Sequence, residues 1–167
     1  NGGIYNYLEL TVVLERDGMA FSTNSDTEVI LAAFVQYGEK AVEMLRGMFG
    51  FVIWDKQEKS VFGARDPFGI KPFFYKEDGD KTYFASEKKS IIHAIEKQEL
   101  DHVSLQHYLT FQFTPEPATM TKYVKKLLPG HCFTKKIGEP MEIRQYWKAE
   151  FKPILRSEPD WIKEIQD

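Results

Sequence analysis

The chain has 167 residues and a formal net charge of -3, with 43% hydrophobic and 28% charged residues. Such values are ordinary for a soluble globular protein, and the length suits one domain with a core of its own. The negative charge argues against nucleic-acid binding, and no apolar run reaches the ~18 residues of a membrane-spanning helix, so we expect neither nucleic acid nor a membrane as a partner.

Helical patterns mark the first forty residues. Residues 8–17 have apolar positions spaced for one buried face and read as a helix. A second helix is predicted over residues 26–37, because Ser25 and Glu28 have the spacing of a capping box. Because the first of these helices begins at residue 8, Asn1 is expected in a turn just before its start.

Short aromatic or β-branched runs follow, separated by turn-forming residues, and their spacing predicts an antiparallel meander. The runs cover residues 49–54, 60–64, 72–75 and 82–85. In the first run, from Phe49 to Trp54, both alternating faces are apolar, so we expect this strand to be buried on both sides. A sheet packed on a second sheet, with helices outside, would satisfy that demand.

The second half of the chain returns to helical patterns and then to strands. Helices are predicted over residues 86–95 and 102–109, the latter capped by Asp101. A terminal hairpin is expected to end near Trp147, after which the composition becomes polar. Residues 161–166 look like the opening of a further helix.

The single cysteine, Cys132, excludes an internal disulfide and favours a reducing, cytoplasmic setting. Its neighbours indicate a half-buried strand residue, since a reactive thiol needs an electropositive environment. The four histidines have no metal-ligand spacing, and we expect no metal site.

Several segments together resemble one known family. They read NGGIYNY at residues 1–7, LRGMFGFVIWD at 45–55, ARDPFGIKPFFY at 64–75, YFASEKK at 83–89 and LPG at 128–130. In this order they resemble the glutaminase domain of glutamine-dependent asparagine synthetases, a class II glutamine amidotransferase domain. The resemblance implies an α+β fold, a four-layer αββα sandwich of the N-terminal-nucleophile hydrolase type, incomplete here at its N-terminus. It assigns residues 1–150 to the glutaminase domain and residues 151–167 to a linker and the start of a synthetase domain.

The resemblance implies hydrolysis of glutamine as a source of ammonia. In the family the mature first residue is a cysteine, whose thiolate attacks the glutamine amide without help from a metal. This chain lacks that cysteine, so we expect the chain alone to be inactive. The ammonia is expected to pass to a C-terminal synthetase domain, where ATP and magnesium serve the amidation of aspartate. No cofactor is expected in the glutaminase domain itself.

The opening motif supplies the candidate site. By resemblance, the Asn1 side chain and the Gly2 backbone N–H form an oxyanion hole, and Asp26 binds the α-ammonium group of glutamine. The family normally has Glu at the position of Gly3, and its absence predicts weaker glutamine binding. From the residues alone, Asn-Gly-Gly is typical of an ordinary turn, and Asp26 is typical of a charge at a helix start.

Arg65 and Asp66 could suggest an acid and its partner, but a structural ion pair that fastens the following Pro-Phe-Gly turn is the preferred interpretation. Two alternatives to the main hypothesis stay open. One is a non-catalytic amidotransferase-like scaffold, favoured by Gly3, and the other is the glutaminase domain of another class II amidotransferase. The sequence also leaves a homodimer open.

Overall fold

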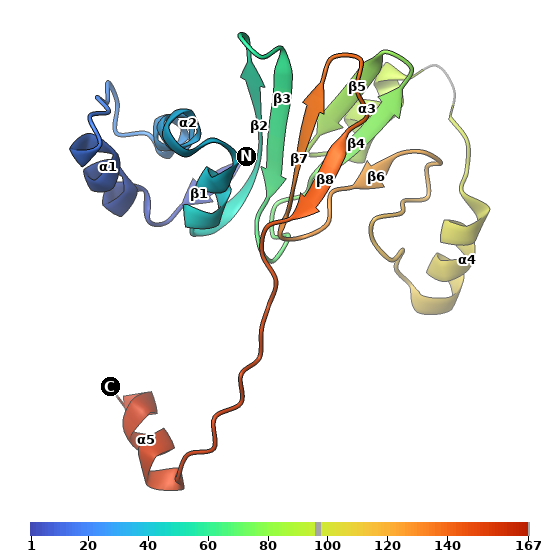
Figure 1. The fold of residues 1–167 in the computed structure, drawn as a ribbon. Coiled ribbons are helices and arrows are strands. Elements are labelled where there is room, and N and C mark those ends of the chain that lie inside the picture. The colour runs from blue at the N-terminus through green and yellow to red at the C-terminus, as the bar shows by residue number, and fades with distance from the viewer. Residues whose placement is uncertain (96–97, 167) are drawn as a thin grey trace.

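The computed structural model describes residues 1–95 and 98–166. Strands form the middle of the molecule (Figure 1). They are β1 (Gly2–Ile4), β2 (Gly47–Asp55), β3 (Ser60–Arg65), β4 (Phe74–Asp78), β5 (Lys81–Ala85), β6 (Lys125–Lys126), β7 (His131–Lys136) and β8 (Glu142–Gln145). They build a five-stranded sheet in the order β1-β2-β3-β7-β8 and a three-stranded sheet in the order β5-β4-β6. The paired strands within each sheet run antiparallel.

Helices lie outside the two sheets. They are α1 (Tyr7–Arg16), α2 (Asp26–Tyr37), the 3-10 helix η1 (Gly38–Met44), α3 (Lys88–Ala94), α4 (His102–Phe111) and α5 (Glu158–Gln166). The predicted helices are therefore present, with ends that differ by up to three residues from those expected. Figure 1 shows the chain after β8 leading away from both sheets to α5. Within residues 1–95 and 98–166, none of the helices is both long and apolar enough for a bilayer.

Three separate apolar clusters divide the molecule into layers. The first joins α1, α2 and η1 to the five-stranded sheet and includes Leu14 and Phe49. The second lies between the sheets, where Phe133 of β7 packs with Phe73 just before β4. The third joins α3 to the three-stranded sheet through Ile91. Three apolar interfaces require four layers, so the predicted αββα sandwich is confirmed.

The predicted meander is wrong in one respect, because its four runs belong to two sheets. β2 pairs with β3, and β4 pairs with β5, but β3 takes β7 as its other neighbour. The chain crosses from one sheet to the other between Arg65 and Phe74. This crossing puts Tyr75 into the apolar space between the sheets. A local pattern of strands and turns carries no signal for such a change of sheet.

The expectation that the first run is buried on both sides is also wrong. Phe49 and Ile53 are buried, but Val52 is 42% exposed and Trp54 is 48% exposed. In the described part of the chain, the cluster between the sheets draws on Val61 of β3 and on β7, and it contains no residue of β2. The second sheet therefore covers the middle of the larger sheet and leaves the far half of β2 open.

The start of α2 is fixed by its side chains, although not as a capping box. Ser25 Oγ accepts a backbone N–H of the first turn, as expected of an N-cap. Glu28 turns instead to the preceding loop, where it accepts the backbone N–H groups of Ser22 and Thr23 at 2.8 and 2.7 Å. The Thr23 hydroxyl is the main cause that holds the pKa of Glu28 below its usual value. The loop that precedes Asp26 is thereby tied to the first turn of the helix.

Candidate active site

The site lies where the first residues form an edge strand. β1 pairs with β2, with Gly2 opposite Phe49. Asn1 and Gly50 continue this ladder and exchange both backbone hydrogen bonds, at 3.0 and 2.9 Å. The expected turn before a helix is therefore a strand, and α1 begins only at Tyr7.

The ladder decides where the Gly2 N–H points. In an antiparallel pair, hydrogen-bonded and non-hydrogen-bonded positions alternate. Because Asn1 makes a hydrogen-bonded pair, Gly2 occupies the other kind of position, and its N–H points away from β2. The N–H of Ile4, two residues on, points the same way. It donates to Oδ2 of Asp26 at 3.0 Å.

Asp26 therefore lies on the side of β1 that the Gly2 N–H faces. N–H groups two residues apart on a strand are separated by roughly 7 Å. This separation is about the length of an extended glutamine between its side-chain amide and its α-amino group. Asp26 is also the first residue of α2, where the helix dipole favours a carboxylate.

One cavity of about 240 Å³ joins the candidate residues. Its polar end contains Asn1, Gly2, Gly3 and Asp26, and its other walls are largely apolar, from Ile4, Thr27, Ile30, Leu31, Phe49, Phe51, Val52 and Ile53. All the site residues expected from the sequence thus line one cavity. A small amino acid would meet hydrogen-bonding groups at one wall and side chains of α2 and β2 at the others.

The two glycines of the motif differ in what they require. Gly2 has φ +130, and a Cβ there would lie 1.9 Å from the backbone oxygen of Met48. At Gly3 a Cβ would meet only Oδ2 of Asp26, at 3.8 Å, an ordinary contact. Position 2 therefore needs glycine, whereas position 3 has room for a side chain that would begin beside the Asp26 carboxylate.

Two further residues hold the motif, and the sequence interpretation gave neither a role. The Asn1 side-chain Nδ2 lies 3.5 Å from Oγ of Ser86, which follows β5 in the other sheet. Asn6 is buried, and its amide bridges the carbonyl of Met44 at 3.0 Å and the N–H of Arg46 at 2.9 Å. Ser86 was hidden in a predicted helix that starts two residues later. The polarity of Asn6 was visible, but its distant partners were not.

The expected ion pair between Arg65 and Asp66 is wrong, although both residues fasten the turn. In the described chain, the ion-pair partner of Arg65 is Glu116 at 2.9 Å. Arg65 also donates to the carbonyls of Gly69 and Lys71, both at 2.8 Å. The carboxylate of Asp66 instead accepts hydrogen bonds from backbone N–H groups of the same segment.

The charge of the buried Arg65 side chain is balanced by Glu116. Desolvation raises the pKa of Glu116, but hydrogen bonds from Lys126 and Arg65 outweigh it and leave that pKa below its usual value. The carboxylate is therefore ionised at neutral pH and neutralises the buried Arg65 guanidinium. This ion pair joins the end of β3 to a distant segment of the chain, and neither residue lines the cavity beside Asp26.

Cys132 is fully buried in β7, deeper than the half-buried position expected. Burial raises the pKa of its thiol to about 11. Two strands separate β7 from β1, so about 14 Å of sheet lies between the thiol and the motif. Cys132 is consequently a neutral core residue.

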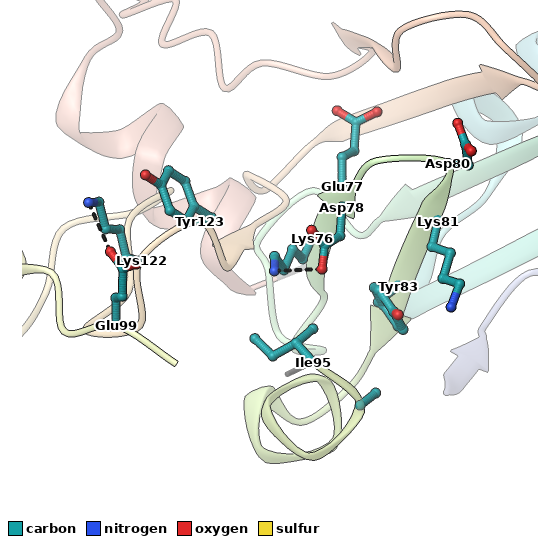
Figure 2. A pocket seen from close by; sticks show the side chains of 11 residues that line it. Lys76, Glu77, Asp78, Asp80, Lys81, Tyr83, Ile95, Glu99, Lys122 and Tyr123 are labelled. Carbon is teal, nitrogen blue, oxygen red and sulfur yellow. Dashed lines mark hydrogen bonds and ion pairs between the residues drawn. The ribbon is translucent and has the colours of Figure 1, made fainter. Parts of the chain in front are cut away.

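A larger pocket of about 680 Å³ lies on the three-stranded sheet, away from β1 (Figure 2). Four of its charged side chains form ion pairs within the chain, Lys76 with Asp78 at 3.0 Å and Lys122 with Glu99 at 3.1 Å. None of the candidate residues of the opening motif lines it. Size alone therefore does not make it the site.

Comparison with known proteins agrees with the fold and the motif. A family described as "Glutamine amidotransferase domain" matches residues 1–147. The chain is 48% identical over its whole length to "Asparagine synthetase [glutamine-hydrolyzing] 1" of Bacillus subtilis and covers 26% of that protein. It is 44% identical over 140 residues, 81% of this chain, to a "Putative asparagine synthetase [glutamine-hydrolyzing]" of Mycobacterium tuberculosis, covering 21% of it. The chain thus spans about a quarter of the length of these relatives.

A solved structure has the same fold at low sequence identity. Glutamine phosphoribosylpyrophosphate amidotransferase of B. subtilis superposes with a TM-score of 0.60 at 23% identity, over 89% of this chain and 28% of that one. The chain belongs to the glutamine amidotransferase domain family.

Proposed function

We propose that the cavity beside β1 binds glutamine for hydrolysis to glutamate and ammonia. The amide oxygen lies at the Gly2 N–H and the Asn1 side-chain amide, and the α-ammonium group lies at Asp26. One observation carries the proposal: the Gly2 N–H and the Asp26 carboxylate lie on the same side of β1, because Ile4 donates to Asp26.

The chemistry assigned to these groups is stabilisation of an oxyanion. A cysteine thiolate adds to the amide carbon, and the negative charge that forms on oxygen accepts hydrogen bonds from Gly2 and Asn1. The carbon–nitrogen bond then breaks, ammonia leaves with the proton that the α-amino group of that cysteine had taken from the thiol, and water hydrolyses the thioester to glutamate. We assign the thiolate to an N-terminal cysteine of a longer protein, because Cys132 is buried and neutral.

For the longer protein we propose an asparagine synthetase that uses the ammonia to amidate aspartate. The names and identities of the relatives support this choice. ATP and magnesium would serve a second domain, which would also be the partner of this one, and the single buried cysteine fits a cytoplasmic location. We place the domain border near residue 150, since the family match ends at residue 147. The glutaminase domain of another class II amidotransferase is the nearest alternative.

A non-catalytic scaffold is the second candidate function. Gly3 favours it, because among the described residues that line the cavity Asp26 is the one carboxylate at the ammonium end, where the family normally has two. A scaffold would need no ordered oxyanion donor, whereas the enzyme would. The two functions therefore differ in what happens when Asn1 is changed.

The test is ammonia release from glutamine by the complete protein, before and after Asn1→Ala. Loss of one oxyanion donor typically lowers kcat about 100- to 1000-fold. Gln57→Ala is the matched control, since it removes an exposed side-chain amide in the turn between β2 and β3. A protein that releases no ammonia, or an Asn1→Ala variant as active as the control, would contradict the enzymatic proposal.

A further inference from the structure

We propose that Asp66 is a positioning residue for the oxyanion hole, acting through the backbone of Phe49. The inference rests on the proposed function. Asp66 is fully buried and does not line the cavity, so it has no contact with substrate. Its carboxylate is nevertheless joined to the segments behind both oxyanion donors.

The carboxylate completes the ladder where β3 ends. Asp66 lies opposite Phe49, one step beyond the last named pair of β2 and β3. Its N–H donates to the Phe49 carbonyl at 2.8 Å. Its main-chain oxygen has turned away and accepts from Gly69 and Gly130, at 3.1 and 3.0 Å. Oδ2 takes the place of that oxygen and accepts the Phe49 N–H at 3.3 Å.

Gly2 cannot move independently of this backbone. A Cβ built on Gly2 would lie 2.8 Å from the Cα of Phe49, which shows how closely the two backbones approach. The Gly2 N–H points into the cavity only while this register holds, since a slip of one residue would turn it toward β2. A displacement of the Phe49 backbone therefore also displaces the Gly2 N–H.

The same oxygen also supports the second donor. Oδ2 of Asp66 accepts the N–H of Lys71 at 2.9 Å, which fixes the segment that leads to Phe73. Gly50 packs against that segment, since a Cβ built on Gly50 would lie only 3.4 Å from the Phe73 ring. Gly50 in turn makes both backbone hydrogen bonds to Asn1.

A carboxylate is suited to this position, and an amide is not. Oδ1 accepts two more backbone N–H groups, from Phe68 at 3.1 Å and Ile70 at 2.9 Å, so both oxygens face donors only. Asparagine has nearly the same size but one acceptor oxygen, and its NH2 group would face two backbone N–H groups. A buried donor without a partner is unfavourable, so the backbone on one side has to shift.

The test is Asp66→Asn in the complete protein. We expect kcat for ammonia release to fall about 10- to 100-fold, as displaced donors do in other enzymes, with KM for glutamine within about twofold. Asp101→Asn is the matched control, because Asp101 also accepts a backbone N–H, that of Ser104 at 2.7 Å, but at the start of α4. The control should lower stability and leave kcat unchanged.

Hydrogen–deuterium exchange supplies a measurement that does not depend on activity. In Asp66→Asn, peptides containing residues 1–5 and 47–50 should exchange faster than in the unchanged protein, and in Asp101→Asn they should not. If the unchanged protein releases no ammonia, the proposed function fails, and the exchange result still decides the role of Asp66. Should Asp66→Asn fail to fold, Arg65→Lys loosens the same turn from its carbonyl side and should lower kcat in the same way.

The proposal is overturned if Asp66→Asn leaves both kcat and exchange at residues 1–5 unchanged. It is also overturned if KM alone rises, or if Asp101→Asn lowers kcat as much. A general loss of stability would affect both variants, whereas a positioning role affects only the one that touches Phe49.

Discussion

The backbone N–H of Ile4 donates to Oδ2 of Asp26 at 3.0 Å, which joins the edge strand to the first residue of α2. This hydrogen bond sets the distance between the two ends of the candidate glutamine site. It also uses one carboxylate oxygen for structure and leaves the charge for a ligand. The fold and the site therefore share the same side chain.

Substitution of Asp26 should separate these two uses. Asp26→Asn keeps an acceptor for the Ile4 N–H but removes the charge that would attract an ammonium group. We expect glutamine affinity to fall about 10- to 100-fold with little change in thermal stability, since a charge-assisted hydrogen bond contributes roughly 1.5 to 3 kcal/mol. Isothermal titration calorimetry with glutamine measures the affinity. Glu28→Gln, in the same helical turn, is the control, and equal affinities in both variants would refute the assignment.

Restoring an acid beside Asp26 should strengthen binding. Gly3→Glu adds a second carboxylate at a position whose Cβ has room. One added charge-assisted hydrogen bond predicts a gain in glutamine affinity of about 10- to 100-fold. Gly3→Gln has the same length without the charge and should give much less. No gain from Gly3→Glu would show that the ammonium group does not lie there.

The two glycines should respond in opposite ways to alanine. Gly2→Ala places a methyl group against the Met48 carbonyl at a φ that L-residues rarely adopt, and we expect a loss of at least about 2 kcal/mol in the free energy of unfolding. Gly3→Ala should change it by less than about 0.5 kcal/mol. Chemical denaturation of both variants decides this, and similar values would mean that β1 is not held as described.

The Cys132 thiol should be unreactive in the folded chain. Its pKa is raised from 9.0 to about 11, so the folded state favours the protonated thiol. The contribution of this group to stability is complete below pH 9 and is lost as the pH rises toward 11. Iodoacetamide at pH 8 should label the denatured chain and not the native one. Rapid labelling of the native protein would place the thiol outside the core.

Local signals in the sequence predicted much of the fold. α2 has the predicted bounds, and Asp101 caps α4 as expected, because a cap and a helix depend on neighbours within a few residues. The exposure of Val52 and Trp54 was not predictable, since it depends on where the second sheet lies. Sheet membership is a long-range property that a strand pattern does not contain.

The candidate site divides in the same way. Asn1, Gly2 and Asp26 were found through the family motif, and they line one cavity. The contact of Ser86 with Asn1 joins residues from different sheets, so no local pattern predicts it. Asp66 was visible as a charged residue before a turn, but its four backbone donors and its link to Phe49 exist only in the folded chain.

The most direct measurement is a crystal structure of the complete protein with glutamine bound and the attacking cysteine replaced by alanine. We predict the amide oxygen within hydrogen-bonding distance of the Gly2 nitrogen and Asn1 Nδ2, and the α-nitrogen at the Asp26 carboxylate. Glutamine bound in the opposite orientation, or in the pocket of Figure 2, would contradict the account.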